Sequence, residues 1–375
     1  MRRVAAIVSP WSKRRAHRVV ALENVISSWT PEVNYLVLIQ EAADVERIVD
    51  LVVRGVENLG WIEGPEIELG DVVMPILGKG SVDVSYRRSD VHHTLFLTNR
   101  CNSNCLMCSQ PPTKDEDGWL VDEAIDIVRH IENSPESIGL TGGEPLLTGN
   151  RLREVLDEIH LRHPMMRIDL LTNGRLLSNR GTAAALLDGL EARVAWLVPL
   201  YGHAHMLHDF VVQSPGAFEQ TLEGILRLQE HGQPIQVRIV LIEPVLERLI
   251  DLCEFIGKSL PFIHEVALMA CEPIGFALAN KEVCDLDLQD WWPTLMRASR
   301  TLRRYGVRHM FMNTPLCALP KDLWPLAVRS ISDWKQVYSD ECAGCSVMDS
   351  CSGLFAWHER GWKPTKIRKI EEMVE

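Results

Sequence analysis

Three cysteines stand close together, Cys101, Cys105 and Cys108, in a C-x3-C-x2-C spacing. Three thiolates can hold three corners of a four-iron cluster and leave one iron open to a substrate or cofactor, whereas a fully ligated cluster mostly carries electrons. The spacing differs from the paired C-x2-C of most structural zinc sites, although a zinc ion completed by His92 or His93 is an alternative. The spacing of the three cysteines therefore favours a reactive iron–sulfur centre over a zinc site.

The turn after an expected strand at 137–141 is suited to a positively charged ligand. Its glycines expose backbone carbonyls to close approach, and its carboxylate can pair with a cation. A Gly-Gly pair alone is usually only a turn, so the prediction of a ligand-binding role depends on its position at the end of a strand. The residues are Gly142, Gly143, Glu144 and Pro145.

A further polar turn, Thr172-Asn173-Gly174, ends the next expected strand at 166–172. Asn-Gly pairs are common in ordinary turns, so the residue types alone leave a purely structural role open. The place of this turn in a series of strand ends favours a ligand-binding role.

A second set of cysteines lies near the C-terminus, where Cys342, Cys345 and Cys351 follow Cys317. Four thiolates would complete one four-iron cluster and make it an electron carrier or a structural element. A zinc-ribbon-like site with four cysteine ligands is the alternative.

Three more cysteines stand outside these two sets. Cys271 or Cys284 could replace Cys317 as the fourth ligand in the tail. Cys253 falls on an amphipathic helix and is expected in the core. A loop with three histidines could bind substrate or move protons, or could simply be solvated; these are His203, His205 and His208.

The composition limits the class of protein. The chain has 375 residues, 46 % hydrophobic and 24 % charged, with a net charge of −12. No apolar run approaches the roughly 18 residues that span a bilayer, and no secretory segment is evident, so we expect a cytoplasmic protein with no membrane partner. Ten cysteines are then metal ligands or buried thiols rather than disulfides. The absence of a basic stripe disfavours a nucleic-acid partner.

Alternating strand and helix patterns position the polar turns. Strands are expected at 94–98, 137–141, 166–172, 193–200, 235–242 and 262–269, with helices near 121–132, 150–162, 178–191, 216–231 and 244–259. This alternation predicts a parallel sheet with right-handed crossovers, whose strand ends share one edge. The polar turns should therefore meet at that edge.

The fold class is α/β, with three expected domains. A six-unit partial (β/α) barrel over 91–280 follows a small α+β domain of unknown role at 1–90 and precedes a loop-rich iron–sulfur domain at 281–375. The alternation is expected to stop after residue 279. In the first domain the pattern predicts a strand at 33–39, a helix at 42–56 and two or three strands within 66–86.

The cysteine run and the two polar turns resemble the motifs of the radical S-adenosylmethionine (SAM) enzymes. The resemblance implies a [4Fe–4S] cluster on the three cysteines, with SAM on the open iron. It also implies reductive cleavage of SAM to a 5′-deoxyadenosyl radical, which abstracts hydrogen from the substrate in an oxidoreductase-type reaction.

The same resemblance implies roles for individual residues in SAM binding. The Gly142–Pro145 turn would receive the methionyl ammonium, and Thr172 or Asn173 would lie near the SAM carboxylate or the cluster. Met107, where relatives usually have an aromatic residue, would pack on the adenine, and Val240 would present backbone to it. The fourth strand departs from the family pattern, which puts the ribose contacts in doubt.

Several sequence segments resemble those of one subfamily, the radical SAM maturases of His-Xaa-Ser peptide systems (the C-type member of a pair). These segments are residues 70–73, 86–89, 95–112, 268–273 and 330–334. The tail cysteines look like a twitch/SPASM-like auxiliary-cluster domain. This resemblance implies a ribosomally synthesised precursor peptide as substrate, a second [4Fe–4S] cluster, a second radical SAM maturase, and an electron donor such as flavodoxin or ferredoxin. The alternatives are a radical SAM enzyme for a small molecule or nucleobase, and a non-catalytic zinc or iron–sulfur protein.

Overall fold

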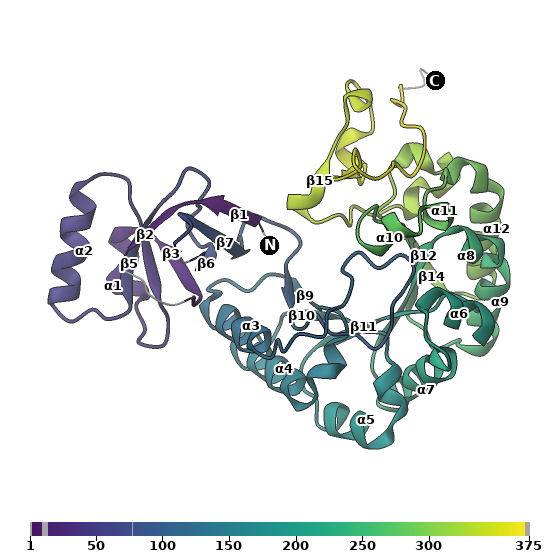
Figure 1. Ribbon diagram of the computed structural model, residues 1–375, viewed down its shortest axis with the longest axis horizontal. Coiled ribbons are helices and arrows are strands. Elements are labelled where there is room, and N and C mark those ends of the chain that lie inside the picture. The colour runs from purple at the N-terminus through teal and green to yellow at the C-terminus, as the bar shows by residue number, and fades with distance from the viewer. Residues whose placement is uncertain (1, 10–13, 77, 372–375) are drawn as a thin grey trace.

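A computed structural model describes residues 2–9, 14–76 and 78–371. Figure 1 shows a small N-terminal unit beside a larger, curved α/β unit, with the C-terminal tail lying over one side of the larger unit. In the described part of the chain no helix is long and apolar enough to cross a membrane.

The N-terminal unit is built on a seven-stranded mixed sheet in the order β1-β7-β6-β3-β4-β5-β2. Its elements are β1 (Arg2–Ala5), β2 (Ile7–Ser9), β3 (His17–Val20), α1 (Val25–Ser28), β4 (Tyr35–Leu38), α2 (Ala43–Val53), β5 (Leu59–Glu63), β6 (Val72–Ile76) and β7 (Ser81–Tyr86). The predicted strand at 33–39 and helix at 42–56 correspond to β4 and α2, and β6 and β7 fall within 66–86. The sequence does not predict β1, β2, β3 or β5. The first three of these have only three or four residues, too few for a clear alternation.

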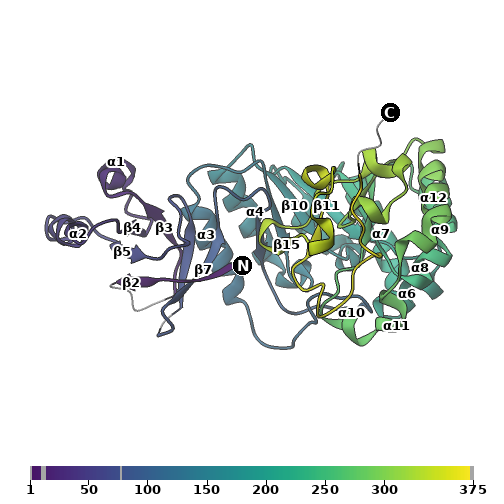
Figure 2. The same ribbon diagram turned by 90° about the horizontal axis from the view of Figure 1, so that it is seen from above.

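Helix α3 (Trp119–His130) lies beside the N-terminal sheet (Figure 2). Polar contacts join the two. The backbone N–H of Asn34 donates to Nε2 of His130 at 2.9 Å. Nε of Arg18 donates to the carbonyl oxygen of His130 at 2.9 Å, and the N–H of Ala16 donates to the Asp126 carboxylate at 2.8 Å. Since the His130 side chain is fully buried, its neutral ring is part of the joint between the two units.

The larger unit is a seven-stranded sheet in which neighbouring strands are parallel and follow one another in chain order. The strands are β8 (Thr94–Phe96), β9 (Ser137–Thr141), β10 (Arg167–Leu171), β11 (Val194–Pro199), β12 (Ile235–Leu241), β13 (Glu265–Ala270) and β14 (Arg308–Met312). The helices after α3 are α4 (Asn150–Arg162), α5 (Arg180–Leu187), α6 (His205–Val212), α7 (Ala217–Glu230), α8 (Glu243–Glu247), α9 (Leu249–Ser259), α10 (Phe276–Ala279), α11 (Lys281–Cys284) and α12 (Trp292–Arg304). The predicted parallel sheet of a partial barrel is confirmed, with β8 to β13 at the six predicted strands.

The seventh strand corrects the expectation that the alternation stops after residue 279. Helix α12 buries one face, and β14 then pairs in parallel with β13. The strand escapes prediction because it opens on Arg308 and His309, two polar residues that interrupt the apolar pattern. The sheet therefore extends beyond residue 280, into the part of the chain assigned to the tail.

Alternate residues of the strands face opposite sides of the curved sheet. On β12, Val237, Ile239 and Leu241 are buried, whereas Gln236, Arg238 and Val240 are partly exposed and face the interior of the barrel. The edge strands β8 and β14 are not paired with each other, so the barrel is open on one side. The tail adds a short antiparallel pair, β15 (Gln336–Val337) and β16 (Leu354–Phe355).

Acid should weaken the joint between the two units. Burial lowers the pKa of His130, so below the ordinary histidine pKa near 6.5 the unfolded chain takes up a proton that the folded chain refuses. We expect stability to fall as the pH drops from 7.5 to 5, with His130 contributing at most about 2 kcal/mol. Thermal unfolding across this range should show a shallower pH dependence for His130→Gln. Parallel curves for the two proteins would contradict the assignment.

Candidate active site

The three clustered cysteines lie on the loop that leaves β8 at the C-terminal edge of the parallel sheet. All three thiols are partly buried. Burial, with smaller contributions from the neighbouring thiols and, for Cys101, the Glu144 carboxylate, raises the pKa of Cys101 to about 11 and that of Cys105 to about 12. Burial also raises the pKa of Cys108. The thiols are therefore near neighbours that retain their protons until a positively charged group binds them.

This cysteine loop is held on its far side by segments from later in the chain. The N–H of Asn104 donates to the carbonyl oxygen of Val212, the last residue of α6, at 3.0 Å. The N–H of Phe276 donates to the carbonyl oxygen of Cys108 at 2.8 Å. A Cβ on Gly275 would come within 2.4 Å of that same oxygen. The loop after β13 therefore fits closely against the third cysteine.

Gly142 and Gly143 lie against the backbone that leads into Cys101. The N–H of Gly143 donates to the carbonyl oxygen of Thr98 at 2.7 Å. A Cβ on Gly143 would stand 2.2 Å from the carbonyl oxygen of Arg100, and one on Gly142 would stand 2.5 Å from that of Thr98. No side chain fits at either position without moving a backbone. The two glycines thus set where the cysteine loop begins.

The carboxylate of Glu144 joins the second and third strand ends from a fully buried position. Its Oε1 accepts from the Thr172 hydroxyl at 2.5 Å and from the N–H of Leu146 at 2.9 Å. Its Oε2 accepts from the N–H of Asn173 at 2.6 Å. Burial raises the pKa of Glu144, and these hydrogen bonds oppose the rise. The sequence suggests a partner for a cation, whereas in the structure this carboxylate first serves to hold the Thr172-Asn173 turn.

The third strand end reaches the cysteine loop directly. Nδ2 of Asn173 donates to Oδ1 of Asn102 at 2.6 Å. Arg175 donates to the hydroxyl of Ser103 at 2.9 Å. The structure therefore brings together the three motifs that the sequence places at successive strand ends. Pro145 and Met107 are buried beside them, and Val240 is partly buried on the interior face of β12.

Two charged residues near this site are missed by sequence reasoning. Asp117, with 2 % of its surface exposed, accepts from the Thr98 hydroxyl at 3.0 Å and so fixes the approach to the cysteines. Arg238 lies on the interior face of β12, where Nε donates to Gln236 at 2.9 Å. Among the described residues no acceptor is hydrogen-bonded to its two terminal nitrogens. Burial lowers the pKa of Arg238 to about 10. The sequence does not identify this residue, because its lack of a hydrogen-bond partner is visible only in the folded barrel.

The histidine-rich loop is partly structural. Nδ1 of His208 accepts from the N–H of Tyr201 at 3.2 Å, and the two rings stack at 5.9 Å. Burial lowers the pKa of His208 to about 4, which keeps the ring neutral. His205 is exposed and His203 is half-buried.

The four tail thiols line one cavity; they are Cys317, Cys342, Cys345 and Cys351. Backbone N–H groups point at two of the sulfur atoms. Those of Leu316 and Gly353 donate to Cys351 at 3.4 and 3.5 Å, and that of Ile370 donates to Cys345 at 3.4 Å. In the described part of the chain no three His, Cys, Asp or Glu side chains are spaced to hold a single metal ion.

The remaining cysteines lie elsewhere. Cys271 follows β13 and Cys284 lies in α11. Both are buried, and their thiols are neighbours. Neither lines the tail cavity. Cys253 is fully buried in α9.

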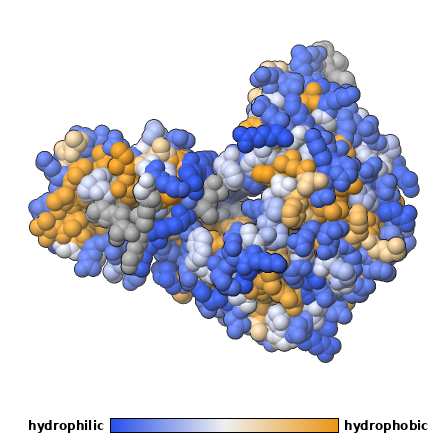
Figure 3. Space-filling model, viewed as in Figure 1, coloured by the Kyte–Doolittle hydropathy of each residue, from blue (hydrophilic) through white to orange (hydrophobic). Residues whose placement is uncertain are grey.

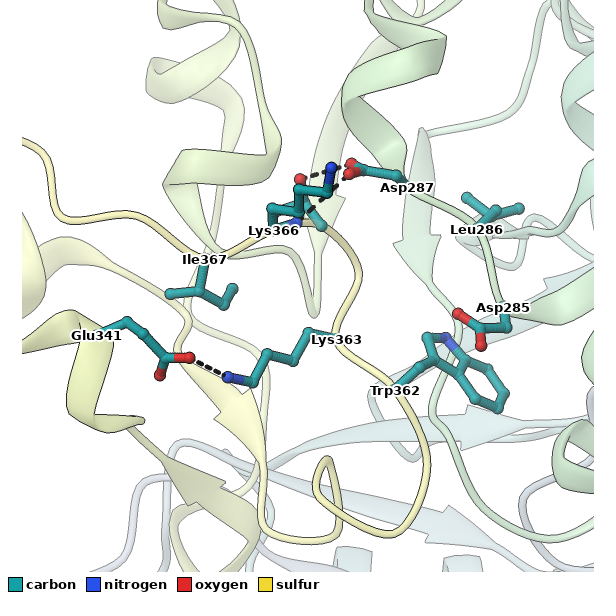
Figure 4. Close-up of a pocket in the computed structure, with 9 residues that line it drawn as sticks. Asp285, Leu286, Asp287, Glu341, Trp362, Lys363, Lys366 and Ile367 are labelled. Atoms are coloured by element: carbon teal, nitrogen blue, oxygen red, sulfur yellow. Dashed lines mark hydrogen bonds and ion pairs between the residues drawn. The ribbon is translucent and has the colours of Figure 1, made fainter.

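A second pocket of about 470 Å³ adjoins the tail cavity and shares Ile367 with it (Figure 4). Two of its charged side chains bind each other, since Lys363 pairs with Glu341 at 2.7 Å. The Thr365 hydroxyl donates to the Asp287 carboxylate at 2.5 Å.

A partial barrel of parallel strands with three cysteines on the loop after its first strand has the architecture of the radical SAM proteins. Residues 95–256 match the model of the Radical SAM superfamily. The match covers the cysteine loop and both polar turns. Members of the superfamily are enzymes that use a [4Fe–4S] cluster and SAM.

Curated relatives match part of the chain. A probable GTP 3′,8-cyclase of Methanocella arvoryzae is 32 % identical over 161 residues, covering 42 % of this chain and 50 % of the relative. The antilisterial bacteriocin subtilosin biosynthesis protein AlbA of Bacillus subtilis is 25 % identical over 166 residues, covering 44 % of this chain and 36 % of AlbA. The chain thus spans half or less of the length of these two relatives.

A solved structure of similar fold covers more of the chain. SuiB of Streptococcus suis bound to S-adenosylmethionine superposes with a TM-score of 0.55 at 12 % identity, over 74 % of this chain and 76 % of SuiB. At this identity the likeness concerns the fold.

The close approach at Gly143 gives a direct test of how the site is positioned. We expect Gly143→Ala to lower the free energy of unfolding by about 1–3 kcal/mol, because the new methyl group must displace the backbone at Arg100. It should also lower the iron bound after anaerobic reconstitution. Gly118→Ala is the matched control, since nothing lies within 4 Å of its added Cβ. Wild-type stability and iron content in Gly143→Ala would refute this account.

Proposed function

We propose that the protein is a radical SAM enzyme that modifies a ribosomally synthesised peptide of the His-Xaa-Ser repeat type. The proposal rests on the presence of two separate groups of cysteine thiols. Three thiols lie at the mouth of a parallel barrel, and four more line a cavity in the tail.

The residues at the barrel mouth fit a [4Fe–4S] cluster with SAM. Cys101, Cys105 and Cys108 would hold three irons, and the chemistry supplied there is one-electron cleavage of SAM to a radical that removes hydrogen from the substrate. The chain's own contribution is placement. Exposed carbonyls of the Gly142–Gly143 turn can accept from an ammonium. The terminal nitrogens of Arg238, which have no hydrogen-bond acceptor in the described part of the chain, can pair with a carboxylate.

The tail thiols fit a second, fully ligated cluster. Cys317 completes the set in this proposal, because Cys271 and Cys284 lie outside the cavity. Backbone N–H groups that donate to Cys345 and Cys351 would stabilise negatively charged sulfur. Such a cluster would exchange electrons with the barrel site or with a donor such as flavodoxin or ferredoxin.

A peptide substrate is supported by the similarity to AlbA, whose name places it in bacteriocin biosynthesis. The open side of the barrel would admit a polypeptide, and the acidic chain suits a histidine-containing one. The proposal includes a cytoplasmic location and a second radical SAM maturase as partner. The alternative function is that of a nucleotide-modifying enzyme. It is supported by the sequence identity to a probable GTP 3′,8-cyclase.

Separate cysteine variants should distinguish the two thiol sets. We expect Cys345→Ala to lower bound iron by about half while SAM binding persists, because one of two clusters is lost. Cys105→Ala should abolish SAM cleavage, because a ligand of the reactive cluster is gone. Cys253→Ala, a buried cysteine outside both sets, is the control and should keep full iron. Unchanged iron in Cys345→Ala would remove the tail cluster from the proposal.

The reaction is tested by anaerobic formation of 5′-deoxyadenosine from SAM and a strong reductant. The assay is run alone, with a His-Xaa-Ser repeat peptide, and with GTP. We expect formation to rise with the peptide and the peptide mass to change. A rise with GTP alone would favour the nucleotide alternative, and no product from a fully iron-loaded protein would refute the enzyme assignment.

A further inference from the structure

The interior of the barrel is open on one side, because the edge strands β8 and β14 are not paired with each other. Helices cover the convex side of the curved sheet (Figure 1). The surface is hollowed between the N-terminal unit and the tail, on the concave side (Figure 3). Arg238 lies on the interior face of β12 and keeps part of its surface accessible. This arginine is therefore largely covered without being sealed from solvent.

The guanidinium of Arg238 is held from one side only. The side-chain nitrogen of Gln236 donates to Oε1 of Glu265 at 2.7 Å, and its oxygen accepts from Nε of Arg238 at 2.9 Å. The described residues offer no hydrogen-bond acceptor to the two terminal nitrogens. A guanidinium fixed at Nε presents these nitrogens as a planar fork, whose geometry matches the two oxygens of a carboxylate.

The carboxylates of the chain that lie nearest to this fork have other partners. Both oxygens of Asp169 accept from Arg167, at 3.0 and 3.2 Å, and Glu265 binds the amide described above. Burial lowers the pKa of Arg238 although Asp169, Tyr201 and Glu265 all favour its charged form. The protein therefore compensates the buried positive charge only in part, and a bound anion would complete the compensation.

Tyr201 lies between this arginine and the cysteine loop. It follows β11, and 6 % of its surface is exposed. The phenol interacts electrostatically with the thiols of Cys105 and Cys108 and with Arg238, whereas no cysteine is among the groups that act on Arg238. In residues 2–9, 14–76 and 78–371 nothing is hydrogen-bonded to the Tyr201 hydroxyl. This hydroxyl is therefore a second donor without an acceptor, next to the fork.

We propose that Arg238 and the Tyr201 hydroxyl form a binding site for an acidic side chain of the substrate. The identity of the substrate as a peptide rests on the proposed function. Because the phenol lies between Arg238 and the thiols, a cofactor held on the cysteine loop leaves the fork to another molecule. An Asp or Glu side chain bound there would anchor the peptide inside the barrel, and the site would select peptides that carry such a residue.

The site is tested by peptide binding to the full-length, iron-loaded protein with SAM and without reductant, measured anaerobically by fluorescence anisotropy. The probes are labelled His-Xaa-Ser repeat peptides with amidated C-termini, in which Xaa is either Asp or Asn. We expect the wild type to bind the Asp peptide at least tenfold more tightly. Arg238→Gln should lose this preference and bind the Asn peptide within twofold of the wild type. No preference in the wild type, or an unchanged preference in the variant, would overturn the proposal.

Two further variants separate the site from general effects on charge and folding. Tyr201→Phe keeps the ring and should reduce the preference for the Asp peptide at least threefold, which tests the site even if Arg238→Gln folds poorly. Arg180→Gln removes the same charge from an exposed position at the start of α5 and should bind both peptides as the wild type does. An equal loss of preference in Arg180→Gln would overturn the site.

Two other sources of a carboxylate are distinguished by additional measurements. An Asn peptide with a free C-terminus that binds as tightly as the Asp peptide would support the site and assign the carboxylate to the peptide end. A loss of SAM affinity of at least tenfold in Arg238→Gln, measured by equilibrium dialysis, would assign the fork to SAM and overturn the proposal. Wild-type protein that makes no 5′-deoxyadenosine would instead refute the proposed function, and the binding preference would still decide the site.

Discussion

The site depends on two backbone segments that pass so close to each other that only glycine fits where they meet. The chain leaving β8 crosses the turn after β9 at Gly142 and Gly143, where any Cβ would collide with a carbonyl oxygen. This approach places the start of the cysteine loop, and Asp117 fixes it from the other side. Glu144 then ties the turn to the third strand end, which in turn holds the loop. The thiols are therefore positioned by a rigid frame rather than by their own loop.

The frame is made of charged and polar groups kept away from water. Glu144, Asp117 and His208 are each almost fully buried and hydrogen-bonded. Losing one partner would leave a buried polar group unsatisfied, which costs more than the hydrogen bond contributes. Arg238 differs because its terminal nitrogens have no hydrogen-bond acceptor among the residues that the structure describes. A ligand that supplies a negative charge would complete the network.

The sequence predicts what depends on local pattern and on motif spacing. The six strands from β8 to β13 have strong apolar patterns, and the cysteine and glycine motifs lie at their ends, so the partial barrel and its edge are predicted. Contacts between distant segments leave no such signal. The burial of Glu144, the anchoring by Asp117 and the short strands of the N-terminal sheet depend on partners far along the chain. β14 is not predicted from the sequence because its first two residues are polar.

The parallel sheet is assembled in the order of synthesis, since each strand pairs with the one made before it. The contact between Asp333 and Val91 is an exception, because it joins residues 242 positions apart in the chain. A growing chain can therefore form β8 to β13 and the cysteine loop before the C-terminal segment has left the ribosome. The cysteine loop is then available to iron and sulfide during translation, before the tail has folded.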